Sequence, residues 1–287
     1  MWKRIIAYIE LVKPLNNSKS TLYYGFCAFI GSLLAGSWGM PVVASLAVAV
    51  AITLSAFAVY ALNDICDVEI DKINDQKRPL PSGRVTMREA KILTVALFAA
   101  ALSLAYVVNI WAFTFTLIFS FLGIAYSVPP LRFKDGLFAN IIWGIGIGTA
   151  IIGGASVGEV NIHAIAAAFT MAFLTAGCGF TKDLKDLKGD RALNIHTLPI
   201  ILGEKKAIKV MTAASALGFP LFFLDVLSAD TNVAYVATIA AAIAVFAISL
   251  QVLRKTPATK ASYKKGYKLQ ATAGFLITIA FVVNALI

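Results

Sequence analysis

The chain has 287 residues, of which 59% are hydrophobic and only 14% are charged, and its formal net charge is +10. Soluble globular domains carry roughly 25% charged residues, so this composition excludes an ordinary water-soluble fold and predicts a membrane protein. The basic residues lie in short segments between long apolar stretches. This pattern argues against a nucleic-acid partner and favours contact with anionic membrane lipids.

The N-terminal segment, residues 1–13, is predicted to form a short helix that ends before Pro14. Helical spacing gathers its large apolar side chains on one face. A helix with such a face lies in the membrane interface rather than across the bilayer. The residues on that face are Trp2, Ile5, Ile6, Ile9 and Val12.

Nine apolar stretches follow, each near the ~20 residues that a helix needs to cross a bilayer. The division between the third and the fourth stretch, at Asn109-Ile110-Trp111, decides whether the count is nine. The nine predicted spans are 17–37, 41–62, 90–109, 111–127, 137–158, 162–181, 207–226, 232–253 and 269–287.

The distribution of charge provides an independent check on this count, because basic residues favour cytoplasmic loops. With nine spans and the N-terminus inside, the inner segments hold all 25 Lys and Arg. The outer loops carry only Glu159, Asp225 and Asp230. We therefore predict a multi-pass cell-membrane protein with a cytoplasmic N-terminus and an external C-terminus.

Two acidic motifs share the spacing D-x-x-D-x-x-x-D, one after the second predicted span and one after the sixth. Four spans separate them, so both motifs are expected on the cytoplasmic side. The spacing i, i+3, i+7 places three carboxylates on one face of a helix end, where they can share a divalent cation. The predicted metal ligands are Asp64, Asp67, Asp71, Asp183, Asp186 and Asp190.

Basic side chains accompany both motifs in the two longest inner loops, 63–90 and 182–206. Carboxylates followed closely by arginines, lysines and a Gly turn indicate a site for metal plus phosphate. The alternative is that these cations only fix the topology. The candidate phosphate-binding residues are Lys77, Arg78, Arg84, Lys134, Lys182 and Arg191.

Four motifs in this order resemble the UbiA superfamily of intramembrane prenyltransferases. They are Asn63-Asp64-x-x-Asp67-x-x-x-Asp71, KRPLPSGR (77–84), YSVPPLRFK (126–134) and KDLKDLKGDR (182–191). The resemblance covers the whole chain, so 1–287 is expected to be one domain. It implies an all-α membrane protein, with about nine transmembrane helices bundled around a central cavity and a cytoplasmic polar cap. It also implies a Mg²⁺ cofactor and an isoprenyl diphosphate donor, whose prenyl group passes to a lipid or aromatic acceptor.

The resemblance assigns roles to individual residues. It places Asn63 with the first metal and diphosphate motif, Arg78 and Arg84 in the basic loop near the diphosphate, and Lys134 after the Tyr-Ser-x-Pro segment. Tyr126 is expected to face the reacting carbon as a catalytic residue. The alternative for Tyr126 is an ordinary tyrosine at the membrane interface.

The second motif is most similar to the archaeal branch that makes digeranylgeranylglyceryl phosphate and to the related chlorophyll synthase branch. We therefore expect transfer of a geranylgeranyl group to geranylgeranylglyceryl phosphate in ether-lipid synthesis, with release of diphosphate. The alternative is an aromatic or quinone-precursor acceptor of the 4-hydroxybenzoate or chlorophyllide type. A cation transporter is the remaining alternative from another class.

The fifth predicted span is rich in glycine, with Gly144, Gly146, Gly148, Gly153 and Gly154. Small residues in a membrane helix favour close packing against neighbouring helices. The second interpretation is that they open space for a prenyl chain.

Overall fold

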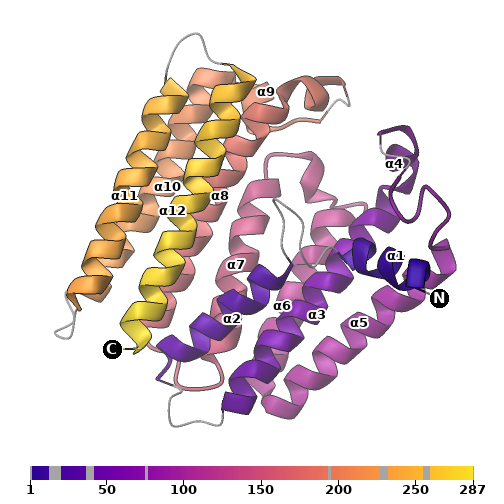
Figure 1. Cartoon of the computed structure of the whole chain (residues 1–287), viewed down its shortest axis with the longest axis horizontal. Coiled ribbons are helices and arrows are strands. Elements are labelled where there is room, and N and C mark those ends of the chain that lie inside the picture. The colour runs from indigo at the N-terminus through magenta and orange to yellow at the C-terminus, as the bar shows by residue number, and fades with distance from the viewer. Residues whose placement is uncertain are drawn as a thin grey trace.

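The computed structural model describes residues 2–12, 21–36, 42–74, 77–192, 195–226, 232–254 and 259–286. This part of the chain forms twelve α-helices and one short 3₁₀ helix, arranged as in Figure 1. The helices are α1 (Trp2–Val12), α2 (Leu22–Leu34), α3 (Val42–Cys66), α4 (Val68–Asn74), α5 (Met87–Val108), α6 (Ile110–Ser127), η2 (Phe133–Asp135), α7 (Ala139–Ala155), α8 (Ile162–Ala192), α9 (Leu198–Leu202), α10 (Glu204–Val226), α11 (Val233–Arg254) and α12 (Lys260–Leu286).

Each of the nine apolar stretches predicted from the sequence coincides with one helix, namely α2, α3, α5 to α8 and α10 to α12. Within the described residues, six of these helices are long and apolar enough to cross a membrane. Two shorter apolar helices, α2 and α7, accompany them. The prediction of an all-α, multi-pass membrane protein is confirmed, while the crossing of all nine helices stays a prediction.

The helices form two groups that meet at α7 and α8. Figure 1 shows α10, α11 and α12 on one side and α3, α5 and α6 on the other. Helix α8 packs on α7, α10 and α12, and α2 packs on α3 and α7. The main apolar core lies between these helices and includes Ile30, Ile52, Ile147, Ile151 and Ile277. This packing holds the ends of α3, α6, α7 and α8 around a common space.

Glycines allow α7 to approach its neighbours at backbone distance. A Cβ atom on Gly154 would collide with the Ala28 carbonyl of α2, and one on Gly144 would collide with the Ala172 carbonyl of α8. By contrast, a Cβ on Gly146 would meet only the Phe119 ring, at 3.9 Å. The close-packing interpretation is therefore correct for Gly144 and Gly154, whereas Gly146 lines a cavity.

The predicted break between the third and the fourth span is confirmed. Helix α5 ends at Val108, and Asn109 begins α6 by accepting a hydrogen bond from the backbone N–H of Ala112 at 2.7 Å. Its amide nitrogen also donates to the carbonyl of Ser156 at 2.9 Å. An Asn side chain satisfies a backbone donor that the start of a helix otherwise leaves without a partner, so the chain reverses here with few added residues.

The second acidic motif lies on a helix and not in the loop expected from residue 182. Helix α8 continues to Ala192 because Leu184 and Leu187 are buried against Met211 of α10 and Tyr263 of α12. Apolar side chains at this spacing keep one face of the helix in the core. The polar residues of the motif therefore project from a continuous helix.

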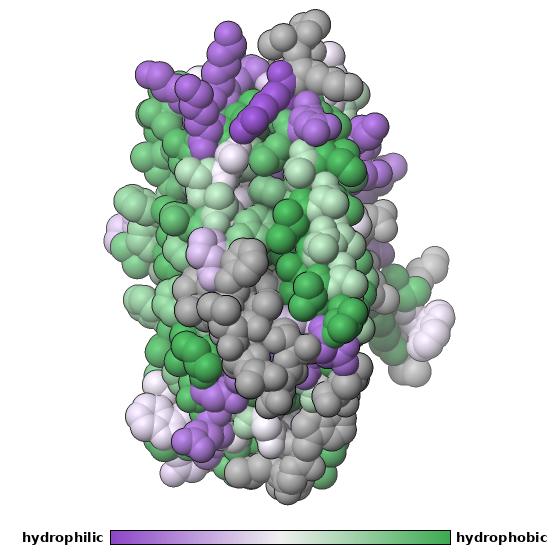
Figure 2. Space-filling model, turned by 90° about the vertical axis from the view of Figure 1, so that its left-hand side faces the viewer, coloured by the Kyte–Doolittle hydropathy of each residue, from purple (hydrophilic) through white to green (hydrophobic). Residues whose placement is uncertain are grey.

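The molecular surface has the polarity expected in a bilayer. Figure 2 shows the side on which α10 and α11 lie, where apolar side chains cover the middle and hydrophilic ones gather at the upper end. Exposed basic side chains at that end include Lys205, Arg254, Lys260, Lys264 and Lys265. Helix α1 has the exposed apolar side chains expected of an interfacial helix, and its place in the interface stays a prediction. It packs on α3 through the buried Ala7 and Leu11 and exposes Trp2, Ile5, Ile6 and Ile9.

Candidate active site

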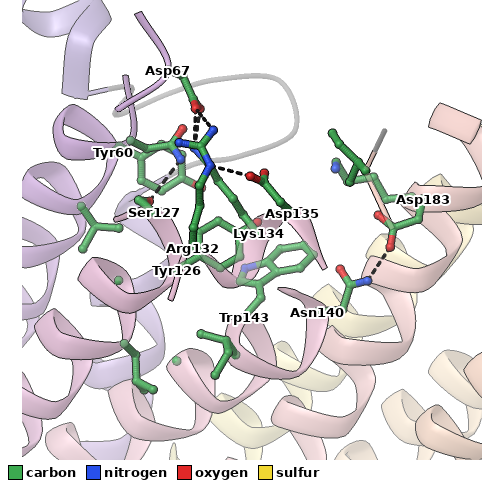
Figure 3. A pocket seen from close by; sticks show the side chains of 18 of the residues that line it. Tyr60, Asp67, Tyr126, Ser127, Arg132, Lys134, Asp135, Asn140, Trp143 and Asp183 are labelled. Atoms are coloured by element: carbon green, nitrogen blue, oxygen red, sulfur yellow. Dashed lines mark hydrogen bonds and ion pairs between the residues drawn. The ribbon is translucent and has the colours of Figure 1, made fainter. Parts of the chain in front are cut away.

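A cavity of about 370 Å³ lies between the ends of α3, α6, α7 and α8. Figure 3 shows its charged upper part, with Asp67 on one wall and Asp183 on the other, and the rings of Tyr126 and Trp143 between them. Of the site residues predicted from the sequence, eight line this cavity: Asn63, Asp67, Asp71, Arg78, Tyr126, Lys134, Lys182 and Asp183.

Asp67 is the centre of the first polar cluster. It occupies the turn between α3 and α4, and both of its carboxylate oxygens accept from Lys134 Nζ at 2.6 Å. Arg132 Nη2 donates to the same carboxylate at 3.0 Å. The Asn63 amide completes the cluster when its nitrogen donates to Asp67 at 3.3 Å and its oxygen accepts from Lys134 Nζ at 3.0 Å. This orientation is chosen because it satisfies both ends of the amide.

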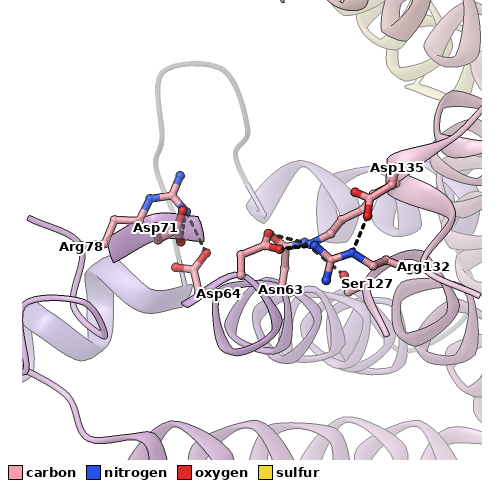
Figure 4. A network of polar contacts seen from close by, with 9 residues as sticks. Asn63, Asp64, Asp71, Arg78, Ser127, Arg132 and Asp135 are labelled. Atoms are coloured by element: carbon pink, nitrogen blue, oxygen red, sulfur yellow. Dashed lines mark hydrogen bonds and ion pairs between the residues drawn. The ribbon is translucent and has the colours of Figure 1, made fainter. Parts of the chain in front are cut away.

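Asp64 and Asp71 share one cation, Arg78, as Figure 4 shows. The Arg78 guanidinium donates to Asp71 at 2.6 Å and to Asp64 at 3.4 Å. Both carboxylates are buried. Burial raises the pKa of the Asp71 carboxyl above its ordinary value, and the nearby Arg78 charge offsets only part of that rise. Each acidic residue of the first motif therefore contacts a basic side chain from a following loop.

Arg132 belongs to the same cluster although sequence reasoning did not select it. Its guanidinium joins Asp67 to Asp135, with the Nε atom donating to Asp135 at 2.5 Å. Burial lowers the pKa of Arg132, but its bonds to the two carboxylates outweigh this effect and leave the pKa raised. Arg132 therefore stays charged and holds the turn before η2 against the end of α3.

The second acidic motif contributes Asp183 to the opposite wall. Asp183 is buried and accepts from the Asn140 amide of α7 at 2.6 Å. Gly179, one turn earlier on α8, makes room for this contact, since a Cβ there would collide with the Asn140 amide. Asp186 lies outside the cavity lining and forms looser pairs with Lys182 at 3.8 Å and Lys185 at 3.6 Å.

The other predicted residues of the second motif do not reach the cavity in the described part of the chain. Arg191 is exposed at the end of α8, and it is not among the lining residues. The predicted ligand Asp190 has a side chain that falls outside the described residues.

Two predicted cations of the basic loop point away from the cavity. Arg84 pairs with Glu10 of α1 at 2.6 Å and donates to the Lys77 carbonyl at 2.5 Å. The hydrogen bond to Glu10 raises the pKa of the Arg84 guanidinium. Lys77 itself is exposed. The geometry of Arg84 fits a residue that ties α1 to the 77–84 loop.

Aromatic side chains form the lower part of the cavity. Tyr126 and Trp143 lie below the charged cluster in Figure 3, and Tyr60 lies beside it. Deeper still, Tyr24 of α2 and Phe119 of α6 pack edge to face with their ring centroids 5.2 Å apart. The cavity is therefore charged at one end and aromatic at the other, as a site for an amphiphilic substrate requires.

The carboxylates have the chemistry of a hard-cation site. Oxygen ligands from Asp and Asn suit Mg²⁺, and Asp67, Asp71, Asp183 and Asn63 line one cavity. As the side chains lie, however, no three His, Cys, Asp or Glu residues in the described part of the chain converge on a common point. Metal binding at these residues would require the carboxylates to exchange their Arg, Lys and Asn partners for the cation.

Comparison with known proteins identifies the family. A model of the UbiA prenyltransferase family matches residues 24–276. The chain belongs to this family. It is 33% identical to the digeranylgeranylglyceryl phosphate synthase of Pyrococcus furiosus, over 97% of each chain. It is 30% identical to the enzyme of the same name from Thermococcus kodakarensis, over 98% of each.

Solved structures share the fold of this UbiA prenyltransferase family member. A structure described for digeranylgeranylglyceryl phosphate synthase in membranes superposes with a TM-score of 0.85 at 26% identity, covering 99% of both chains. A UbiA homologue from Archaeoglobus fulgidus, bound to GPP and Mg²⁺, superposes with a TM-score of 0.68 at 20% identity, covering 96% of this chain and 99% of that one. The prediction of a UbiA-type prenyltransferase is confirmed.

Several residues of this UbiA-type site were missed by sequence reasoning. The cavity is also lined by Arg132, Asp135, Asn140, Trp143 and Lys185. Arg132 and Asp135 flank the predicted Lys134, so their position in the same turn was an available signal. Asn140 is a polar residue inside an apolar span, a feature that usually marks a functional site. No comparable signal distinguished Trp143 from the other aromatic residues of the membrane helices.

Proposed function

We propose that this UbiA-family protein is a digeranylgeranylglyceryl phosphate synthase. It would transfer the geranylgeranyl group of geranylgeranyl diphosphate to the hydroxyl of geranylgeranylglyceryl phosphate and release diphosphate. The observation that carries the proposal is full-length similarity to synthases of this name, at 30% identity or more over 97% of the chain or more. The division of the cavity into a charged end and an aromatic end supports it.

The charged end would bind the diphosphate of the donor. Arg78 and Lys134 supply positive charge to the leaving group as the allylic C–O bond breaks and the bonding electrons leave with diphosphate. Preorganised cations stabilise such developing charge strongly in a site that excludes water. The positive potential that attracts the donor also comes from Lys182 and, at greater distance, from Lys77, Arg84 and Arg191.

The acidic motifs would hold Mg²⁺ through Asp64, Asp67, Asp71, Asp183, Asp186 and Asp190, with Asn63 beside the first motif. Bound Mg²⁺ neutralises diphosphate charge and makes it a better leaving group. The residues fit this role because they offer only oxygen ligands and because Asp67 and Asp183 face each other across the cavity. The A. fulgidus homologue binds Mg²⁺ together with GPP.

The aromatic end would receive the prenyl chain and protect the reactive carbon. Scission of the donor leaves a delocalised allylic cation, which Tyr126, Tyr60 and Trp143 can stabilise through their ring faces. Their rings and the apolar helices below exclude the water that would otherwise trap the cation. The acceptor hydroxyl then forms the new C–O bond and loses its proton.

The membrane arrangement belongs to the same proposal. All nine helices would cross the bilayer, with residues 1–287 forming one domain and the site and N-terminus on the cytoplasmic side. Six helices already meet the length and hydropathy required. The basic residues at one end of the molecule support this orientation, because basic residues favour the cytoplasmic side of a membrane. Helix α12 carries the C-terminus to the end opposite α4 and α9 (Figure 1).

An assay of the purified protein in lipid nanodiscs tests the proposed activity. Radiolabelled geranylgeranyl diphosphate and Mg²⁺ are supplied with geranylgeranylglyceryl phosphate, 4-hydroxybenzoate or chlorophyllide as acceptor. We expect a labelled two-chain lipid phosphate only from the first acceptor, and EDTA should stop its formation reversibly. Product from an aromatic acceptor, and none from the glyceryl phosphate, would refute the assignment. Ion flux without any lipid substrate would favour the transporter.

A further inference from the structure

A second pocket, of about 440 Å³, lies beside the catalytic cavity. It is bounded on one side by the turn from residue 131 to 138. On the other side lie α9 and His196, which precedes the N-cap residue of α9. Its apolar lining consists of Leu131, Phe133, Leu137, Phe138 and Ile201, and its polar lining includes Arg132, Asp135 and His196. In the described part of the chain, no residue of either acidic motif lines this pocket.

The second pocket and the catalytic cavity share a wall made of two side chains. Arg132 and Asp135 line both spaces, and their 2.5 Å ion pair stands between them. The Arg132 guanidinium also reaches Asp67 of the catalytic cavity at 3.0 Å. A group bound to the far side of this ion pair is therefore one side chain away from the diphosphate site.

The backbone around this wall holds an unusual conformation. Arg132 has φ of 32°, in the left-handed region that non-glycine residues seldom occupy. Hydrogen bonds fix the turn, with Arg132 N–H donating to the Val128 carbonyl at 2.9 Å and His196 N–H donating to the Asp135 carbonyl at 3.3 Å. Strained backbone that is held in this way is common at binding sites. Here it directs the guanidinium between the two spaces.

An apolar stripe on α7 leads from the bilayer to this pocket. Phe138, Ile141 and Ile145 stand at i, i+3 and i+7, on one face of the helix. Their side chains are 57%, 42% and 44% exposed, as expected of a surface in contact with lipid chains. Phe138 is also part of the pocket lining. A chain lying along α7 would therefore bring its head group to Arg132 and Asp135.

We propose that the second pocket docks the acceptor of the reaction, a membrane lipid with an isoprenoid chain and a glycerol phosphate head. This inference rests on the proposed function. The isoprenoid chain lies along the α7 stripe and among the apolar lining. The phosphate binds Arg132 with His196 nearby, and the free hydroxyl donates a hydrogen bond to Asp135. A head with one anion and one hydroxyl is matched by one guanidinium and one carboxylate.

The test measures the Michaelis constants of both substrates in nanodiscs. Ile201→Glu places a negative charge in the pocket, and Leu202→Glu is the matched control, because Leu202 is similarly exposed but outside the lining. We expect Ile201→Glu to raise KM for the acceptor at least about tenfold and to leave KM for geranylgeranyl diphosphate unchanged. Leu202→Glu should change neither. An unchanged acceptor KM in Ile201→Glu would overturn the proposal.

Photolabelling provides a measurement that does not depend on a folded variant. An acceptor analogue with a diazirine in its chain should label residues 137–145 of the wild-type protein, and unlabelled acceptor should compete. Label on α2 or α12 instead, or competition by any bulk phospholipid at equal concentration, would overturn the site. If the wild type makes no product from the glyceryl phosphate, the proposed function itself fails. Turnover with label elsewhere refutes only this docking site.

Discussion

At the scale of single residues, the site consists of carboxylates that already have partners. Asp67 bonds to Lys134 and Arg132, Asp71 bonds to Arg78, and Asp183 bonds to Asn140. Buried carboxylates without such partners would repel one another and lose their charge. The basic residues therefore serve as counter-ions to the carboxylates, and under the proposed function they would bind diphosphate when Mg²⁺ takes the carboxylates.

Asp67 gives the clearest prediction at this scale. Asp67→Asn keeps the size of the side chain but removes the charge that would bind Mg²⁺ and hold Lys134 and Arg132. We expect kcat to fall at least about 100-fold, comparable to the loss of a key electrostatic contact in other enzymes. Steady-state assays with saturating Mg²⁺ measure this effect.

The matched control for Asp67→Asn is Glu159→Gln, which removes an exposed carboxylate from the connection between α7 and α8. This variant should keep wild-type kcat. Near-normal turnover of Asp67→Asn at low Mg²⁺ concentration would contradict the role given to the first motif.

At the scale of elements, α7 connects the two groups of helices through contacts that only glycine permits. Gly154→Ala would drive a methyl group into the Ala28 carbonyl of α2. Overpacking of this kind costs about 1–3 kcal/mol or more, so the melting temperature should fall by several degrees. The melting temperature of each variant is measured in detergent, as the temperature at which heating removes half of the folded peak in size-exclusion chromatography.

Gly146→Ala is the internal control on the same helix, because its added methyl would enter the cavity 3.9 Å from Phe119. It should leave the melting temperature near that of the wild type. Ala has a higher helix propensity than Gly, so equal destabilisation by the two substitutions would show that the collision with α2 is not the cause of the loss.

The Asn109 cap makes a separate prediction for the junction of α5 and α6. Asn109→Ala removes the acceptor for Ala112 N–H and the donor to the Ser156 carbonyl. Loss of such a cap costs about 1 kcal/mol, and the melting temperature should fall by about 2–4 °C. Asn109→Asp keeps the side-chain acceptor of the cap, so its melting temperature should fall less. If the melting temperature of Asn109→Asp falls as far as that of Asn109→Ala, the cap is not the stabilising contact.

The sequence was sufficient for elements whose signal is local. Hydropathy located the nine apolar helices, and Asn109 marked the junction of α5 and α6, because apolar length and helix caps are properties of adjacent residues. The sequence was insufficient where tertiary contacts determine how far a helix extends or where a side chain points. The extension of α8 to Ala192 depends on burial of Leu184 and Leu187, and Arg84 turns away from the cavity because Glu10 of α1 is its partner. Neither contact is visible in a local pattern.

At the scale of the whole molecule, the cavity is lined by residues from both groups of helices. Asp67 and Arg78 come from the N-terminal group, whereas Asp183 and Lys182 come from α8. A metal diphosphate held by both walls binds the folded protein and not the unfolded chain, so it must stabilise the fold.

This linkage is measurable as a shift in melting temperature. Geranylgeranyl diphosphate at about 100 times its Kd, with Mg²⁺, should add about 2.7 kcal/mol to the stability. EDTA should reverse the shift, and both Asp67→Asn and Asp183→Asn should reduce it. An equal shift in either variant would show that the ligand binds without bridging the two walls.

The separation of the cavity into a charged end and an aromatic end also governs how the reaction products part. Diphosphate is soluble only in water, whereas a lipid with two isoprenoid chains is soluble only in the bilayer. The charged end is formed by the C-terminal end of α3, the turn before α7 and the C-terminal part of α8, and the rings of Tyr24 and Phe119 lie deeper among the apolar helices. Diphosphate therefore leaves into water and the lipid product into the bilayer. Because the two exits differ, neither product blocks the release of the other.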